Sequence, residues 1–114
     1  MKLPNAERAF VEHEKIRDYL LNPAHPDNGG KAQFFLSAGF SKDNWQSFAA
    51  ALRQLVETAP VAKKVESPHG IKYVVDAKMM TPQGKMCELR TIWIVDKGEQ
   101  MPRLVTAYPN EKRR

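Results

Sequence analysis

The second half of the chain alternates between apolar and polar residues with a period of two, and short turn signals such as SPHG, TPQGK and DKGEQMP separate the alternating segments. Successive side chains of a β-strand point to opposite faces, so this alternation predicts strands. Connections this short join antiparallel neighbours, because a parallel connection needs a crossover of roughly a dozen residues. The chain is therefore expected to contain a meander of four strands, at residues 61–66, 71–80, 87–95 and 103–108.

The first half of the chain carries the spacing of helices instead. Residues 41–59 place apolar side chains three and four positions apart, after a serine that is a good N-cap. A shorter helix is expected at 31–40, and it closes near its glycine.

Another helix is expected at 12–21, where Ile16, Tyr19 and Leu20 recur at helical spacing on an apolar stripe. The Asn-Pro pair that follows ends this helix, because proline disfavours helical geometry in the residue before it.

Helices followed by short strands define an α+β fold, with N-terminal helices packed on a four-stranded antiparallel meander sheet. A length of 114 residues fits one domain over 1–114. Its expected parts are a helical half over about 1–59, an antiparallel sheet over about 60–109 and a basic tail at 110–114. Each face of the predicted strands mixes polar and apolar side chains, so the pattern leaves open which face the helices cover.

Charge and cysteine content narrow the class of protein. Residues 1–58 balance seven Lys and Arg against seven Asp and Glu, whereas residues 59–114 hold eleven against six, so the net charge of +5 lies in the sheet half. A basic half favours a polyanionic partner such as RNA. The single cysteine excludes a disulfide framework within the chain, and no apolar run approaches a membrane span. We expect a cytoplasmic protein without membrane contact.

One candidate site is the stretch NPAHPDNGGK between two predicted helices. Prolines stiffen the frame around His25, and a histidine side chain can serve as general base or acid. Gly29 and Gly30 permit close approach to the backbone, and Lys31 opens the next helix, where free N–H groups favour anions. This set suits a phosphate. The alternative is a connecting loop of turn residues with a solvated histidine.

The last two predicted strands hold a second group of candidates. In the last strand the alternation opposes two sets of side chains, Leu104, Thr106 and Tyr108 against Arg103, Val105 and Ala107. Thr91 and Trp93 lie on a face related to that of Thr106. Hydroxyl groups can hydrogen-bond a phosphate, and aromatic rings can stack an unpaired RNA base. The alternative is core packing, which we prefer for Trp93 because tryptophan and threonine are favoured strand formers.

Several familiar kinds of site are missing from the sequence. The histidines, the cysteine and the carboxylates show no metal-site spacing, and no nucleotide fingerprint, P-loop or nucleophile elbow is present. We expect neither a metal nor another cofactor. Cys87 lies in an apolar strand segment and is interpreted as a small core residue rather than a nucleophile.

Two blocks of the chain resemble a small bacterial domain family of unknown function. The first follows the pattern N-P-x-H-P…G-x-K-A-x-F and includes His25 and Lys31; the second follows W-I-V…P-R-L-V-T-x-Y and ends at Tyr108. With the opening KLPNAERA, the resemblance covers about residues 2–109.

The layout of that family is similar in turn to the ribonuclease toxin fold of barnase, EndoU, the colicin tRNases and RelE. The resemblance implies a metal-independent, toxin-like ribonuclease in which the RNA 2′-OH attacks the adjacent phosphate, and it implies a cognate antitoxin or immunity protein as partner. On this hypothesis the catalytic residues are His25, Lys31, Arg103 and Thr106. The residues expected to contact substrate are Gly29, Gly30, Thr91, Trp93 and Tyr108. The alternative is a non-catalytic RNA-binding or protein-interaction module on the same fold.

Overall fold

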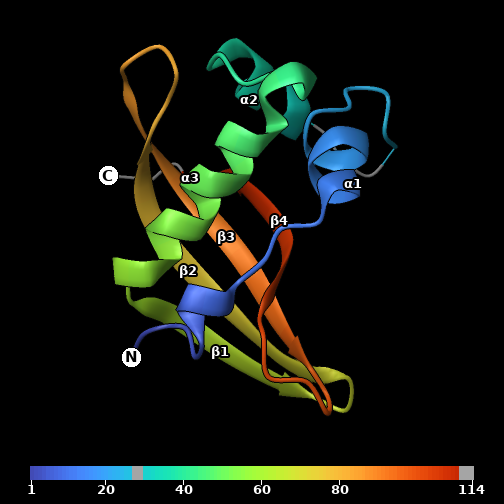
Figure 1. Ribbon diagram of the computed structural model, residues 1–114, viewed down its shortest axis with the longest axis vertical. Coiled ribbons are helices and arrows are strands. Elements are labelled where there is room, and N and C mark those ends of the chain that lie inside the picture. Colours follow the sequence, from blue (N-terminus) through green and yellow to red (C-terminus); the bar gives the residue numbers. More distant parts are fainter. Residues whose placement is uncertain (27–29, 111–114) are drawn as a thin grey trace.

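A computed structural model describes residues 1–26 and 30–110 of the chain (Figure 1). Four strands form one antiparallel sheet in the order β1-β2-β3-β4, and the helices precede them in the sequence. The α+β fold predicted from the sequence is therefore confirmed. Each strand extends the expected segment by one residue at one or both ends. The strands are β1 (Val61–Ser67), β2 (Gly70–Met80), β3 (Met86–Asp96) and β4 (Arg103–Pro109).

The helical half consists of one long helix and several short helical segments. In chain order these are η1 (Ala6–Arg8), α1 (His13–Lys15), the π-helical η2 (Ile16–Leu20), α2 (Lys31–Ser37), η3 (Lys42–Asn44) and α3 (Trp45–Thr58). α1 runs directly into η2, and together they fill most of the helix predicted at 12–21. Within the described parts of the chain, no helix is long and apolar enough to cross a bilayer.

α2 ends at the glycine that the sequence indicated. Gly39 has a φ of 105°, a left-handed conformation that glycine adopts without strain. Its N–H donates to the Leu36 carbonyl at 3.1 Å, and the Phe40 N–H donates to the Phe35 carbonyl at 3.1 Å. These two bonds form a Schellman motif, which satisfies the last carbonyls of α2 and turns the chain toward α3.

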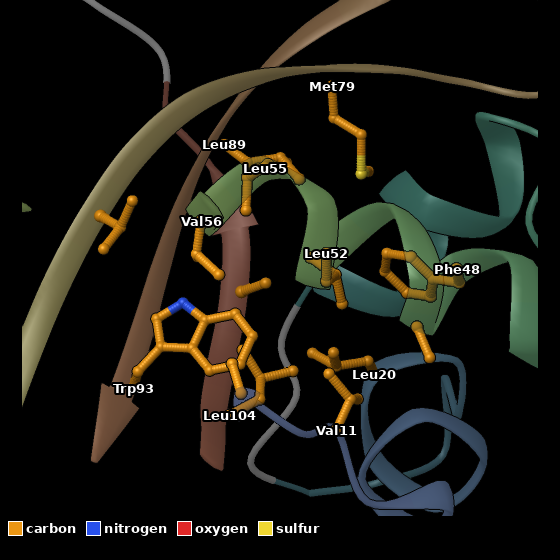
Figure 2. Close-up of a cluster of buried hydrophobic side chains, with 14 of the residues drawn as sticks. Val11, Leu20, Phe48, Leu52, Leu55, Val56, Met79, Leu89, Trp93 and Leu104 are labelled. Carbon is orange, nitrogen blue, oxygen red and sulfur yellow. The ribbon is translucent and has the colours of Figure 1, made fainter. Parts of the chain in front are cut away.

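α3 crosses one face of the sheet, and the core lies between helix and strands (Figures 1 and 2). The buried side chains of α3 form the stripe predicted from their spacing: Phe48, Ala49, Leu52, Leu55 and Val56. Burying a leucine side chain of this kind stabilises the fold by about 1.5–3 kcal/mol. Trp45, at the start of the stripe, is only half-buried and stacks on His13 with ring centroids 4.2 Å apart.

The face of β3 covered by α3 carries Thr91 and Trp93, both fully buried. Figure 2 shows the Trp93 ring beside Val56 and Leu104 in the core. The indole Nε1–H donates to the Thr91 hydroxyl at 2.8 Å, and that hydroxyl donates to the Val75 carbonyl at 2.8 Å. Both buried polar groups therefore have partners, as a stable core requires.

β4 contains one residue more than its pairing with β3 needs. Ile92 pairs with Thr106, whereas the next residue, Trp93, pairs with Leu104. Val105 is thus left over as a β-bulge. A bulge interrupts the strict alternation of a strand and re-aims the side chains that follow it.

This bulge makes the predicted grouping of side chains in the last strand wrong. Leu104 and Ala107 are both fully buried, although the alternation assigns them to opposite faces. Thr106 and Tyr108 lie on the other face of the sheet, where Tyr108 pairs with Arg90. Leu104 therefore belongs to the core, and Thr106 and Tyr108 remain accessible.

The N-terminal segment runs along the edge of β4. The Phe10 N–H donates to the Pro102 carbonyl at 3.0 Å, and the Leu104 N–H donates to the Phe10 carbonyl at 3.1 Å. α1 follows this segment and stands beside β4 in Figure 1, and α2 also contacts β4. The helical segments α1 and α2 are thereby placed next to the edge of β4.

Candidate functional site

Lys31, the first residue of α2, extends its side chain toward β4. Its Nζ donates hydrogen bonds to the Tyr19 hydroxyl at 2.6 Å and to the Thr106 hydroxyl at 3.1 Å. The two hydroxyl oxygens lie 3.4 Å apart. These groups come from η2, α2 and β4, so they meet only in the folded chain. We call Tyr19, His25, Lys31 and Thr106 the edge cluster.

Tyr19 belongs to the edge cluster because of a π-turn in its helix. The Leu21 N–H donates to the Ile16 carbonyl, five residues earlier, at 2.8 Å. Ile16, Leu20 and Leu21 are fully buried, whereas Tyr19 is half-buried. The wider turn thus places Leu20 and Leu21 in the core together with Ile16. Tyr19 packs at the margin of that core, with its hydroxyl beside Lys31 and Thr106. Single π-turns of this kind are frequent at functional sites.

His25 is held beside Tyr19 by the hydrogen bonds of Asn22. The Asn22 carbonyl accepts the His25 N–H at 3.1 Å, and the Asn22 side-chain oxygen accepts the Ala24 N–H at 3.1 Å. The Asn22 side-chain amide also donates to the Asp18 carbonyl at 3.2 Å, which ties the loop to the end of η2. The His25 ring meets the Tyr19 ring edge-on, with centroids 5.0 Å apart.

Two lysine side chains lie close to the Tyr19 phenol. The Lys31 Nζ lies 5.0 Å and the Lys15 Nζ 5.2 Å from the centroid of its ring. Burial opposes ionisation of the phenol, but hydrogen bonds from Lys31 and Thr106 and the charges of both lysines outweigh it. The pKa of Tyr19 therefore lies below its ordinary value.

The charge of Lys31 is not neutralised within the described residues, since none of their ion pairs includes it. Its Nζ also lies 5.6 Å from the centroid of the Tyr108 ring. Tyr108 in turn contacts Arg90, whose guanidinium donates to both carboxylate oxygens of Asp76 at 2.8 and 2.9 Å. The Asp76 carboxylate and then Tyr108 raise the pKa of Arg90. Arg90 thus contacts both Asp76 and Tyr108, next to the edge cluster.

One hollow is lined in part by residues of the edge cluster, and a second is lined by none of them. The first has a volume of about 350 Å³, and its lining consists of Glu12, Glu14, Lys15, Asp18, Tyr19 and His25. The second, of about 450 Å³, lies on the sheet face opposite α3, and its lining includes Val65, Lys72, Ile94 and Val105. The first hollow gives solvent and solutes access to His25 and Tyr19. The second is more apolar, and its lining includes Arg103 and Val105 but no residue of the edge cluster.

The expected substrate contacts of Thr91 and Trp93 do not fit the structure. Both residues have an exposed fraction of 0%, and their polar groups bond to each other and to a backbone carbonyl. A ring enclosed in the core has no free face on which a base could stack. Core packing, the alternative that we prefer for Trp93, is what the structure contains.

Arg103 lies on the outer sheet face, but its guanidinium is occupied by carboxylates. Its Nε and Nη2 donate to Asp96 at 2.7 and 3.1 Å, and its Nη1 lies 3.9 Å from a Glu12 oxygen. The hydrogen bonds and charge of Asp96 hold the pKa of Arg103 above its ordinary value. The hydrogen bonds and charge of Arg103 in turn hold the pKa of Asp96 below its ordinary value. Arg103 therefore links β4 to the end of β3 and to the N-terminal segment. We leave it out of the edge cluster, contrary to the expectation from sequence.

The remaining candidates are placed as follows. Gly30 is the exposed N-cap of α2, and Gly29 lies outside the described residues. Cys87 is half-buried, and burial raises the pKa of its thiol, which supports a packing role. Among residues 1–26 and 30–110, no group of three or more His, Cys, Asp and Glu side chains could hold a metal ion. The expected absence of a cofactor remains a prediction.

Tyr19 is the member of the edge cluster that sequence reasoning missed. Its helical spacing with Ile16 and Leu20 assigns it to the apolar stripe, and a π-turn has no signature in that spacing. One signal in the sequence could have identified it. Tyr19 and Lys31 lie on either side of the proline- and glycine-rich stretch that contains His25.

The fold and the edge cluster define an α+β domain with a lysine, a histidine and two hydroxyl groups gathered at one sheet edge. The chain belongs to the family described as "Domain of unknown function (DUF6883)", which matches residues 2–111. This match agrees with the expected membership of a family of unknown function.

Among solved structures, the chain is similar to one from a "Contact-dependent growth inhibition toxin - immunity protein complex from Klebsiella pneumoniae 342". The TM-score is 0.75 at 16% sequence identity, and the alignment covers 94% of this chain and 97% of that chain. At this identity the similarity establishes a shared fold. The curated proteins contain no match to the chain.

Proposed function

We propose that the protein is a toxin-like, metal-independent ribonuclease and that the edge cluster is its active site. The observation that carries the proposal is the position of the Lys31 ammonium, 2.6 Å from the Tyr19 hydroxyl and 3.1 Å from the Thr106 hydroxyl, with His25 packed alongside. A cation, two hydroxyl groups and an imidazole at one accessible edge form a set suited to a phosphodiester. The shared fold with a chain of a toxin–immunity protein complex supports a toxin-like or immunity-like role.

The reaction needs a group that removes the 2′-OH proton and charges that stabilise the phosphoryl oxygens. His25 supplies the first, since an imidazole ring nitrogen can act as a general base. Lys31 supplies the second through its ammonium, and Thr106 positions the phosphate by a hydrogen bond. Tyr108 lines the approach to Lys31.

The test is cleavage of total RNA in the presence of EDTA. We expect the wild-type protein to cleave RNA and His25→Ala to cleave it at least about 10²-fold more slowly, because general acid–base groups contribute on that scale. His69→Ala is the matched control, since His69 is exposed in the β1–β2 turn, and it should retain activity. Absence of cleavage by the wild-type protein, or equal cleavage by wild type and His25→Ala, would contradict the proposal.

A second candidate is a non-catalytic protein-interaction module, for instance one that acts like an immunity protein. The similar structure comes from a complex that contains both a toxin and an immunity protein, and the apolar hollow on the uncovered sheet face suits a protein partner. Induced expression in bacteria separates the two candidates. A ribonuclease toxin arrests growth, and His25→Ala relieves the arrest. An interaction module leaves growth unaffected in both cases.

A further inference from the structure

We propose that Tyr19 is the general acid of the ribonuclease reaction, delivering its phenolic proton to the 5′-oxygen that leaves the phosphorus. This inference rests on the proposed function and deepens it. The sequence assigns one acid–base residue, His25, whereas cleavage by 2′-OH attack benefits from two, one at each side of the phosphate. The residues around Tyr19 identify it as the second.

The position of the Tyr19 hydroxyl is the first reason. It lies 2.6 Å from the Lys31 Nζ and 3.4 Å from the Thr106 hydroxyl oxygen. The phenol therefore contacts both of the groups that would bind the phosphate. The His25 ring lies edge-on to the same phenol, with centroids 5.0 Å apart. A phosphate seated on Lys31 and Thr106 would therefore have an acid and a base within about one nucleotide of each other.

The stability of the phenolate is the second reason. A tyrosine that gives up a proton at neutral pH needs compensation for the negative charge it acquires. Lys31 donates a hydrogen bond to that oxygen, and Lys15 lies over the ring at 5.2 Å from its centroid. These cations hold the pKa of Tyr19 below its ordinary value despite burial, which brings it closer to the working range of an acid catalyst.

The accessibility of Tyr19 is the third reason. The phenol lines the hollow of about 350 Å³ that also contains His25, so solutes reach both residues from one side. Tyr73, by contrast, is buried in the core and has no such access. Tyr108 approaches Lys31 through its ring but lies against Arg90, which suits a wall better than a proton donor.

The step balances without a metal or a co-reactant. The 2′-oxygen forms a bond to phosphorus as its proton passes to the neutral His25 imidazole. The bond from phosphorus to the 5′-oxygen breaks, and the Tyr19 hydroxyl gives its proton to that oxygen. The products are a 2′,3′-cyclic phosphate and a free 5′-hydroxyl, and the enzyme is left with an imidazolium and a phenolate paired with Lys31. A proton returned from His25 to Tyr19 through water restores the starting state.

The test compares Tyr19→Phe with the wild-type protein on two matched oligonucleotides under single-turnover conditions in EDTA. One carries an ordinary linkage, and the other carries sulfur in place of the 5′-bridging oxygen. A thiolate leaves without protonation, so the second substrate needs no general acid. We expect Tyr19→Phe to cleave the oxygen substrate about 10²-fold more slowly or worse, and to cleave the sulfur substrate at nearly the wild-type rate.

Two variants serve as controls in the same experiment. His25→Ala should remain slow on both substrates, because the 2′-OH still needs a base. Tyr108→Phe should match wild type in the ratio of the two rates. The inference is overturned if Tyr19→Phe cleaves the oxygen substrate at the wild-type rate, or if it is equally impaired on both. If the wild-type protein cleaves neither substrate, the proposed function itself fails, and that result is distinct from the others.

A second measurement covers the case in which Tyr19→Phe does not fold, which circular dichroism would reveal. Replacing Tyr19 by 3-fluorotyrosine keeps its shape and makes the phenol more acidic. A general acid must be protonated to act, so the limb of the pH–rate profile that falls at high pH should move to lower pH. An unchanged limb would overturn the inference.

Discussion

Thr91 and Thr106 stand on neighbouring strands and are both candidates from sequence, yet they lie on opposite faces of the sheet. Thr91 is buried under α3, where its hydroxyl accepts a bond from Trp93 and donates one to the Val75 carbonyl. Thr106 is half-buried at the sheet edge, where its hydroxyl accepts a bond from Lys31. The same residue type completes the core in one place and a cation-bearing cluster in the other.

The difference between the two threonines lies in what surrounds each hydroxyl. A buried hydroxyl must have its partners within the protein, and Thr91 has no capacity left for a ligand. At the edge, the hydroxyl of Thr106 faces a lysine without a carboxylate partner among the described residues. We therefore expect substitutions on the covered face to change stability and those in the edge cluster to change activity.

The largest effect should come from Trp93→Ala on the covered face. Removing a fully buried tryptophan leaves a cavity and should lower the free energy of unfolding by about 3–5 kcal/mol. Urea denaturation monitored by circular dichroism measures this change. Met80→Ala, at an exposed position in β2, is the control and should change it by less than about 0.5 kcal/mol. If the free energy of unfolding of Trp93→Ala lay within about 1 kcal/mol of the wild-type value, the assignment of Trp93 to the core would be contradicted.

Lys31→Met tests the edge cluster, and its expected effect rests on the proposed activity. The variant keeps an apolar stem but loses the ammonium that would stabilise the phosphoryl oxygens, so cleavage should fall by about 10²–10³-fold. Single-turnover RNA cleavage measures the loss. Lys97→Met, at an exposed position in the β3–β4 turn, should retain full activity. Full activity of Lys31→Met would remove the edge cluster from consideration as an active site.

The pair Thr91→Val and Thr106→Val sharpens the comparison directly, since both changes replace a hydroxyl by a methyl group. Thr91→Val leaves the buried Trp93 N–H without its acceptor and should cost about 1–3 kcal/mol of stability, with activity unchanged. Thr106→Val should change stability by less than about 0.5 kcal/mol but slow cleavage by about 10- to 100-fold. Urea denaturation measures the stability, and RNA cleavage the activity, of the two variants. A loss of activity in Thr91→Val with a loss of stability in Thr106→Val would contradict the assignment of the two threonines to opposite faces.

The smallest effect concerns the titration of Tyr19. Because its folded pKa is lowered, phenolate absorbance should develop at a lower pH in the wild-type protein than in Tyr19→Phe, and Lys31→Met should move that phase to higher pH. The corresponding stabilisation is present above the ordinary tyrosine pKa and is lost as pH falls through the folded pKa. Identical absorbance titrations of wild type and Tyr19→Phe would show that the surrounding lysines do not act on the phenol.

Most of the fold could be predicted because its signals are local. Alternation with turn residues located all four strands to within a residue at each end, and the apolar spacing of 41–59 located the buried stripe of α3. The glycine that closes α2 was identifiable because few other residues adopt its φ. Each of these features depends on neighbours within a few positions in the chain.

The candidate site could be predicted in part. His25 and Lys31 stood out because proline, glycine and charge concentrate in one short loop. Tyr19 did not, because its spacing with Ile16 and Leu20 indicates only core packing, whereas its contacts with Lys31 and Thr106 form in the folded chain. Arg103 was assigned to the site from the family resemblance, and only the positions of Asp96 and Glu12 reveal that its guanidinium is occupied.

The candidate loop around His25 and the four strands could thus be predicted from the sequence. The signals for chain stiffness, turns and strand alternation each depend on a few neighbouring residues. The choice between the two sheet faces was not, because both mix polar and apolar side chains and only the packing of α3 favours one. The β-bulge at Val105 also places Leu104 in the core and Thr106 on the opposite face of the sheet. A bulge is decided by hydrogen bonding between strands, which is why the position of Thr106 beside Lys31 emerged from the tertiary structure alone.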